Sequence, residues 1–409
     1  MPSIPELTMR CSLTRANCRR FIVLCVALLS LRCHAFEGDR YLLFVGANYT
    51  FDDNVFRLPK TGAIAPTKDH IRQVSGGIGL RLPISRQQLN ATLRWNQTHY
   101  SKLTDLDYRG RSFDLSWLWQ AGNFWSGQMG YLNSRTAAGF TDFIGREQNL
   151  IERRSIFADA NYMLDATHRI EFGLNQQKTS NSADARQTND TRDLNFYLGE
   201  RYLRVGDNSI AWRLNYSDTN APNPLRFGSL AVDNSYKDTR FDLLWDWRWN
   251  GVSRINGRAS YESRRYDAFN ERNFDGLTWV LTYDWTPNEK SAVAIDLRRV
   301  VNGLIDFGHS YYIDEGIAIK PRWYISSKLN LLLEFDYDRL DYRGDPKINP
   351  AFSSRERKDT IKGLGLTLNY LPIRAANMSI SVRREDRTST LPGIDYDSTV
   401  LSGSIDFTF

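Results

Sequence analysis

Apolar and polar residues alternate with a period of two along most of the chain. In residues 241–249, Phe241, Leu243 and Trp245 fall on one side, whereas Asp242 and Asp246 fall on the other. A period of two is that of a β-strand with one face out of water. Each apolar face is about ten residues long, which is the length that a tilted transmembrane strand needs. The same alternation recurs in residues 113–120, 277–285, 329–337 and 364–370.

The segments between these stretches are of two kinds that follow one another strictly, as the short turns and long extracellular loops of outer-membrane barrels do. Tight turn signals occur near Pro83, Ala121, Asp165, Val205, Asn250, Pro287, Ser326 and Pro372. Longer polar stretches occupy residues 52–69, 100–109, 136–148, 179–190, 218–235, 264–272, 302–309, 341–357 and 389–396. Nine long loops and eight turns connect eighteen strands, with sixteen as the lower bound. The pattern predicts an all-β fold, a transmembrane antiparallel up-and-down β-barrel.

A soluble β-sandwich would show the same alternation, and the placement of aromatic residues separates the two folds. One set lies just before the short turns, at Trp117, Trp119, Trp247, Trp249, Trp285, Trp323 and Tyr370. A second set lies just before the long loops, at Trp95, Tyr131, Tyr216, Tyr261 and Tyr337. Two aromatic belts, one at each interface, are typical of membrane barrels, and a water-soluble core gives no reason for this sorting.

The stretch 401–409 alternates without error and ends on an aromatic residue. Leu401, Ile405, Phe407 and Phe409 share one face. A terminal strand of this kind resembles the insertion signal of bacterial outer-membrane β-barrels, which in that family is read by the barrel-assembly machinery. The alternative is the edge strand of a soluble sandwich.

Residues 1–35 have the features of a secretory signal peptide. Four arginines precede an apolar run at 21–31, and small residues at Cys33 and Ala35 predict cleavage before Phe36. The apolar run is too short to span a bilayer, which needs about 20 residues. The predicted organisation is therefore a leader, 1–35, followed by a barrel, 36–409, in the outer membrane of a Gram-negative bacterium.

Removal of the leader changes the charge and the cysteine count. Five of the 53 basic residues, one of the 47 acidic residues and all four cysteines lie within it. The remaining chain is close to neutral, which argues against a nucleic-acid partner, and it can form no disulfide or thiolate metal site. We find no phosphate-binding glycine loop, no metal-ligand spacing and no nucleophile elbow, and we expect no cofactor.

Strand parity directs charged residues of both signs into the lumen, where water or a partner must accompany them. The candidates for the lumen wall are Arg81, Arg94, Glu171, Arg213, Asp242, Asp246, Arg258, Asp284, Asp296, Lys320, Arg322, Glu334, Asp336 and Arg383. They form either a wetted wall braced by ion pairs or a selectivity path for a polar or anionic solute. Sugars favour hydrogen-bonding groups beside aromatic faces, and Tyr197 and Phe44 fall on the inward side.

One pattern favours an enzyme. His99 and Ser101 lie two apart, on one strand face, as a His and a Ser do in outer-membrane phospholipases. The surrounding residues do not match the phospholipase motif, so a lipid hydrolase is the weakest of the hypotheses and we expect a protein that is not an enzyme.

The first long loop contains Asn54-Val55-Phe56-Arg57-Leu58-Pro59. This segment resembles a signature of the EpsL-type proteins, β-barrel porins encoded with exopolysaccharide biosynthesis genes. The resemblance implies a role in making or exporting exopolysaccharide, but it carries no catalytic residues. Phe56 with Arg57 could pin the loop against the lumen wall, and an ordinary loop is the alternative.

The favoured hypothesis is thus a porin-like channel with a mixed-charge lumen that serves exopolysaccharide biosynthesis or export. A general diffusion porin and a loop-plugged scaffold that docks export proteins are the alternatives. Expected partners are membrane lipid, lipopolysaccharide, the barrel-assembly machinery, exopolysaccharide and its export proteins. The loops 264–272 and 341–357, rich in Arg, Asp and Asn, are expected to face the lipopolysaccharide.

Overall fold

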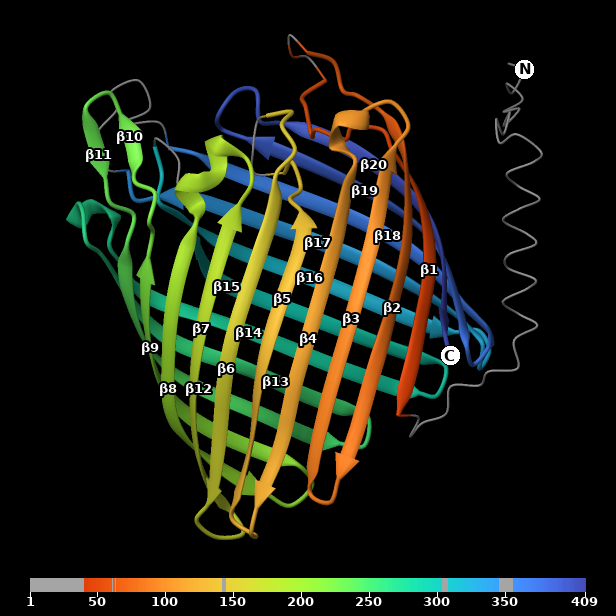
Figure 1. Ribbon diagram of the computed structural model, residues 1–409, viewed down its shortest axis with the longest axis vertical. Helices are drawn as coiled ribbons and strands as arrows, with labels where there is room; N and C mark the ends of the chain where they lie inside the picture. The colour runs from red at the N-terminus through yellow and green to blue at the C-terminus, as the bar shows by residue number, and fades with distance from the viewer. Residues whose placement is uncertain (1–39, 61, 63, 142–144, 304–307, 346–355) are drawn as a thin grey trace.

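The computed structural model describes residues 40–409 except 61, 63, 142–144, 304–307 and 346–355. The predicted signal peptide, 1–35, and its cleavage site lie outside the described residues. Eighteen antiparallel strands form one closed sheet, in which β1 pairs with both β2 and β20. In Figure 1 the strands tilt around the barrel, with tight turns at one end and long connections at the other.

The strand count and the eight turn positions are confirmed, and a break between two strands lies at each predicted long loop, of which 302–309 and 341–357 fall partly outside the described residues. The elements are β1 (Tyr41–Asp52), β2 (Asp69–Ile84), β3 (Gln87–Tyr100), η1 (Thr104–Leu106), β4 (Tyr108–Ala121), β5 (Trp125–Ala137), β6 (Leu150–Met163), β7 (His168–Asn181), η2 (Asp184–Asn189), β8 (Thr191–Arg204), β9 (Asn208–Asn220), β10 (Leu225–Phe227), β11 (Leu230–Val232), β12 (Tyr236–Asn250), β13 (Ser253–Tyr266), η3 (Asn270–Arg272), β14 (Phe274–Asn288), β15 (Ser291–Gly303), β16 (Tyr311–Tyr324), β17 (Leu329–Arg343), β18 (Lys358–Ile373), β19 (Ala376–Ser389) and β20 (Tyr396–Thr408).

One element was not predicted. The loop expected at 218–235 contains a small hairpin in which β10 pairs with β11, outside the barrel sheet. Gly228 has φ +59° at its turn, a conformation that glycine adopts without steric cost. Strands of three residues are too short to establish an alternation, and for this reason the sequence reads as a loop there.

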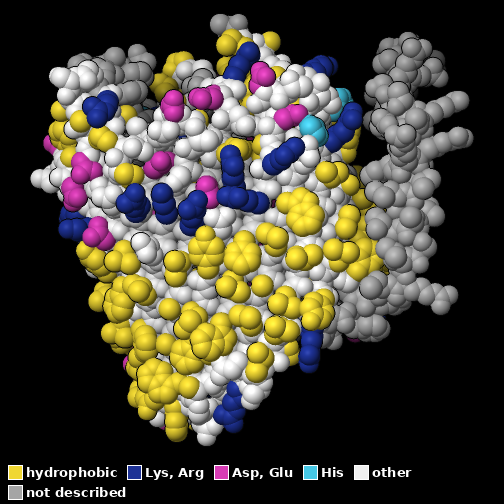
Figure 2. All heavy atoms as spheres, in the orientation of Figure 1, with side chains coloured by type: hydrophobic (Ala, Val, Ile, Leu, Met, Phe, Trp, Pro, Cys, Tyr) yellow, Lys and Arg dark blue, Asp and Glu magenta, His cyan; other side chains and the backbone are white. Residues whose placement is uncertain are grey.

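The apolar faces of the strands point away from the barrel interior. Leu277, Ile380 and Val74 are 64%, 62% and 57% exposed at the outer surface. Figure 2 shows hydrophobic side chains gathered in a broad band over the lower part of the visible face. A soluble protein would bury such residues, whereas a barrel presents them to lipid. Among the residues that the structure describes, no helix is long and apolar enough to cross a membrane.

The C-terminal strand departs from the simple alternation. Leu401 is 41% exposed, as expected for a lipid-facing residue, but Phe407 and Phe409 are 3% and 8% exposed. Their rings stack with centroids 5.9 Å apart, beside Ala376 at the start of β19. The backbone of Phe409 also exchanges two hydrogen bonds with Leu43 of β1, at 2.8 and 2.9 Å. The end of the predicted insertion signal is therefore packed into the junction of the first and last strands.

The inside–outside assignment can be tested on adjacent residues of β19. Val382 lies midway along the strand on the outer face, and Ser381 points into the lumen. We expect Val382→Arg to lower the free energy of unfolding by about 2–4 kcal/mol, because an arginine near the bilayer midplane is costly on the lipid face. Ser381→Arg should change it far less. Urea unfolding in phospholipid vesicles measures both, and equal effects would contradict the assignment.

Candidate functional site

The inner wall holds its most compact ion cluster around Glu171 of β7. Arg169 and Arg201 contact Glu171 Oε1 at 2.5 and 2.6 Å, and Arg213 contacts Oε2 at 3.1 Å. Gly199 lies opposite Glu171 on β8, where a Cβ atom would meet the Trp212 carbonyl oxygen at 2.4 Å. Because three cations surround one carboxylate that is 4% exposed, the cluster braces three neighbouring strands and keeps a positive excess.

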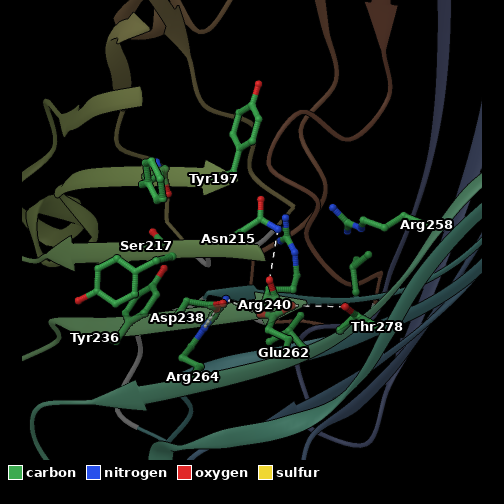
Figure 3. Close-up of a pocket in the computed structure, with 15 residues that line it drawn as sticks. Tyr197, Asn215, Ser217, Tyr236, Asp238, Arg240, Arg258, Glu262, Arg264 and Thr278 are labelled. Carbon is green, nitrogen blue, oxygen red and sulfur yellow. Dashed lines mark hydrogen bonds and ion pairs between the residues drawn. The ribbon is translucent and has the colours of Figure 1, made fainter. Parts of the chain in front are cut away.

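A cavity of about 350 Å³ lies beside this cluster, on the inner face of strands β8 to β15 (Figure 3). Within it Arg264 pairs with Asp238 and Glu262, at 3.1 and 3.0 Å. Arg258 points toward the same space but has no ion-pair partner in the described part of the chain, and its Nε has no hydrogen-bond partner there. The cavity therefore offers one free guanidinium group to a solute. Its other labelled lining residues are Tyr197, Asn215, Ser217, Tyr236, Arg240 and Thr278.

Two aromatic rings point into the lumen, as the sequence predicted. The hydroxyl of Tyr197 donates to Asp159 at 2.8 Å, and the Arg213 guanidinium lies 4.1 Å from the ring centroid. In the same manner, the guanidinium group of Arg94 on β3 lies over the Phe44 ring of β1, 4.2 Å from the ring centroid. Tyr197 also lines a second, larger cavity of about 730 Å³ toward the short-turn end, so the two cavities meet at this residue.

Negative charge prevails on the inner wall of β14 to β19, in contrast to the positive excess around Glu171. Lys320 contacts Asp296 at 2.9 Å and Glu334 at 3.8 Å. Arg383 contacts Asp336 at 2.8 Å and Glu334 at 3.7 Å, so one chain of charges links residues of β15, β16, β17 and β19. Here the carboxylates outnumber the cations, whereas the cations outnumber the carboxylates around Glu171.

The predicted lumen residues thus fall into two groups, those that form ion pairs and those that do not. Strand parity alone could not predict to which group each residue belongs. Asp242 pairs with Arg240 at 2.8 Å, and Asp246 pairs with Arg254. The remaining predicted residues also point inward by strand parity. They form no ion pair with another described residue: Arg81, Arg94, Arg258, Asp284 and Arg322. Six inward arginines that form ion pairs were not predicted from the sequence. They have the same strand parity as the predicted residues, so parity would have identified them: Arg169, Arg201, Arg240, Arg254, Arg264 and Arg298.

The family-like segment 54–59 forms the centre of a mouth cluster, an apolar group at the long-loop end of the barrel. Val55, Phe56 and Leu58 are buried together with Leu106 of η1. The ring of Phe140, from the β5–β6 loop, meets Phe56 edge-on with centroids 4.9 Å apart. Phe56 is therefore 4% exposed, and it anchors the loop against two other loops instead of the lumen wall.

Polar contacts fasten the same loop to the last strand. The Asn54 amide nitrogen donates to Leu58 O at 2.8 Å and to Asp397 O at 2.9 Å, while its oxygen accepts from Leu58 N at 2.9 Å. Arg57 adopts φ +54° and contacts both oxygens of Asp52 at 2.9 Å. Asp53 accepts from Thr399 N of β20 at 2.7 Å. The segment 52–58 is thus held by side-chain hydrogen bonds both within itself and to β20.

The β5–β6 loop crosses the mouth. Arg387 of β19 is 1% exposed and donates to the Thr141 carbonyl oxygen at 2.5 Å, although β20 and β1 to β4 separate β19 from β5. Gln148 at the other end of this loop donates to Leu106 O at 2.6 Å. Because the described ends of this loop are held at β19 and at the mouth cluster, we expect the loop to narrow the entrance to the lumen.

Two arginines of the loop 264–272 turn inward. Arg272 donates to Ser310 Oγ at 2.7 Å, to Asp233 O at 2.7 Å and to Asn234 Oδ1 at 2.8 Å. Burial lowers the pKa of Arg272 from its ordinary value. Arg264 belongs to the cavity described above, so neither side chain faces an external lipopolysaccharide layer. Most of the other loop expected to do so, 341–357, lies outside the described residues.

The histidine–serine pair does not form a catalytic arrangement. His99 Nδ1 lies 2.6 Å from Asp107 Oδ2, and its Nε2 lies 2.9 Å from Gln97 Nε2. Burial would raise the pKa of Asp107, but hydrogen bonds from the Tyr100 N–H and from His99 outweigh that effect and lower it. Both ring nitrogens are engaged, so neither is available to accept a proton from Ser101.

A closed barrel of eighteen strands, with an apolar outer band and a charged interior that requires water, is the architecture of a protein that spans the bacterial outer membrane. The protein is an outer-membrane β-barrel. Residues 256–409 match the family model described as "Putative beta-barrel porin 2". Among curated proteins none matches. Porins are channels, so at the level of this family the likeness favours a channel over an enzyme.

Three solved structures share the fold at low sequence identity. OccK9 (OpdG) of Pseudomonas aeruginosa is 10% identical with a TM-score of 0.53, over 92% of this chain and 100% of that one. OpdK of Pseudomonas aeruginosa is 12% identical with a TM-score of 0.53, over 92% and 100%. A BenF-like porin from Pseudomonas fluorescens Pf-5 is 8% identical with a TM-score of 0.52, over 91% and 100%.

The ion cluster on β7 to β9 gives a stability prediction. Glu171→Gln leaves three arginines without their shared carboxylate, and removing one partner of a buried pair costs about 3 kcal/mol or more. We expect a loss of that size in the free energy of unfolding. Glu334→Gln is the matched control, since its side chain is 37% exposed and its partners lie at 3.7 and 3.8 Å. Urea titration compares them, and losses of equal size would contradict a special role for Glu171.

The mouth cluster gives a conductance prediction. Phe56→Ala removes the ring that holds the β1–β2 and β5–β6 loops together, so single-channel conductance should rise and protease should cleave these loops faster. Phe335→Ala is the control, because Phe335 is 46% exposed on the outer face. Unchanged conductance and cleavage in Phe56→Ala would show that the cluster does not narrow the entrance.

Proposed function

We propose that the protein is a passive channel for hydrophilic solutes, with carbohydrate as the favoured class, acting in exopolysaccharide biosynthesis or export. The support comes first from the hydroxyl and amide groups of the inner wall on β17 to β20 and β1 to β4, which lie among the charged residues described above. Hydroxyl and amide groups contact one another across these strands: Ser379 with Ser404, Thr50 with Ser402, Gln73 with Thr98, Asn90 with Ser116, and Asn369 with Asn330. Such groups exchange hydrogen bonds with sugar hydroxyls and hold no fixed charge.

The inward aromatic rings supply the second kind of contact that a sugar uses. Tyr197 lies where the two cavities meet, and Phe44 lies on the wall that carries the hydroxyl and amide groups. Each ring has an arginine stacked over one face, so a sugar would meet the opposite ring face or the ring edge, with guanidinium donors close by. The observation that carries the proposal is this pairing of aromatic–arginine surfaces with a hydroxyl and amide wall.

The resemblance of segment 54–59 to EpsL-type proteins supports the pathway. That segment is buried at the mouth, so it would act by shaping the loops that a polymer meets at the cell surface. A general diffusion porin is the second candidate, and it is favoured by the ion pairing of most lumen charges, which leaves few groups free to select a solute.

Planar-bilayer recording tests the proposal. We expect an ion conductance that falls when fragments of acidic or neutral exopolysaccharide are added, and block that weakens about fivefold in Tyr197→Ala, since an aromatic surface contributes about 1 kcal/mol. Tyr337→Ala is the control, because Tyr337 is 46% exposed on the outer face. Conductance that sugar fragments do not reduce would replace the proposal with a general porin. An absence of conductance would replace it with the plugged scaffold.

A further inference from the structure

The outer face of strands β2 to β8 carries a basic belt near the long-loop ends of the strands. It consists of Arg72, Arg109, Arg111, Arg135, Arg154, Lys178 and Arg192. Their strand parity is that of exposed outer-face residues such as Val74, Ile156 and Leu174. Figure 2 shows a row of Lys and Arg side chains directly above the apolar band on this side of the barrel.

The arrangement places like charges against one another. Arg111 lies opposite Arg135, and Lys178 lies opposite both Arg154 and Arg192 in the strand register. Like charges directly opposite in a sheet are destabilising, and among the described residues Glu152 alone forms ion pairs with these cations, contacting Arg154 at 2.9 Å and Arg111 at 3.5 Å. The belt residues Arg135, Lys178 and Arg192 have no ion-pair partner in the described ranges. The protein keeps an electrostatic cost on this face that a bound anion would remove.

The rest of the barrel has a smaller excess. At the same level on the other strands, most cations stand beside carboxylates, whereas Lys237, Arg339 and Lys362 have no ion-pair partner among the described residues. The outer-face pairs include Arg265 with Asp275 at 2.7 Å, Arg343 with Asp341 at 2.7 Å, and Arg384 with Asp397 at 3.5 Å. The densest positive surface therefore lies on one side of the barrel, over β2 to β8.

The depth of the belt indicates the kind of anion. Arg111, Arg154 and Arg192 each stand two residues from the apolar Phe113, Ile156 and Leu194 on the same face, a rise of about 7 Å. The cations thus begin where the lipid-facing surface ends, at the depth of the headgroups. Six strand spacings of about 4.8 Å make the belt about 29 Å wide, more than one headgroup.

We propose that the basic belt binds the phosphate groups of a phosphorylated glycolipid in the outer leaflet. The positions favour a lipid over a polysaccharide, because the belt lies on the outer wall at membrane depth and not on the lumen wall or at the loop tips. This interaction is independent of what the lumen conducts, so it goes beyond the proposed channel function.

The test measures binding of a bisphosphorylated lipid A-type glycolipid to the whole protein in non-ionic detergent, by native mass spectrometry. The triple variant Arg135→Gln/Lys178→Gln/Arg192→Gln should bind about a hundredfold more weakly, because each surface cation contributes roughly a factor of five. The control Lys237→Gln/Arg339→Gln/Lys362→Gln removes three cations at the same level elsewhere on the outer face, which likewise have no ion-pair partner among the described residues. It should bind like the wild type.

Three further measurements complete the test. Arg135→Lys/Arg192→Lys keeps the charge and should keep the binding, which guards against loss through misfolding. The dephosphorylated glycolipid should bind the wild type as weakly as the phosphorylated lipid binds the triple variant. The proposal is overturned if the triple variant and its control bind equally, if phosphate makes no difference, or if an acidic oligosaccharide and not the glycolipid depends on the belt.

Discussion

The structure depends on one constraint: in lipid, every backbone N–H and C=O group must find its partner inside the protein. A flat sheet would leave two rows of unpaired groups at its edges, at a cost of several kcal/mol for each group. Pairing of β1 with β20 removes both edges at once, from Phe44 opposite Thr408 to Asp52 opposite Val400. Closure then fixes which face each residue takes, since the outer face meets hydrocarbon and the inner face encloses water.

The same constraint explains why the interior is ionic. A carboxylate such as Glu171 cannot turn outward, and inside the barrel it can meet arginines from two neighbouring strands as well as its own. Eighteen strands are too wide for side chains to fill, so packing by apolar groups is not available to hold the wall. Ion pairs and hydrogen bonds between adjacent strands take that role, and the described apolar clusters occur only at the strand ends and in the loops.

The barrel could be predicted closely from the sequence, because the patterns that specify it lie within single strands and the connections between them. Parity within a strand and the alternation of short and long connections fixed the number of strands and the inward residues, including Tyr197 and Phe44. Partner choice could not be predicted, because Arg201 reaches Glu171 only through the register of β7 with β8, which the sequence does not state. The mouth was beyond prediction for a related reason: Phe56 meets Phe140 across 84 residues, and no periodic pattern records such a contact. Phe407 and Phe409 follow the alternation but are buried, because the strand junction adds packing that parity ignores.

The hydrogen bonds between the β1–β2 loop and β20 determine the order in which the barrel wall and its entrance form. Asn54 and its acceptor Asp397 are 343 positions apart, and the acceptor belongs to the strand that completes the ring. While β1 and β20 remain separate, the loop lacks its anchor, and the crossing loop that rests on it lacks a support. The entrance acquires its final shape only after the wall is complete, so a barrel caught before closure would be open at the top as well as at the side.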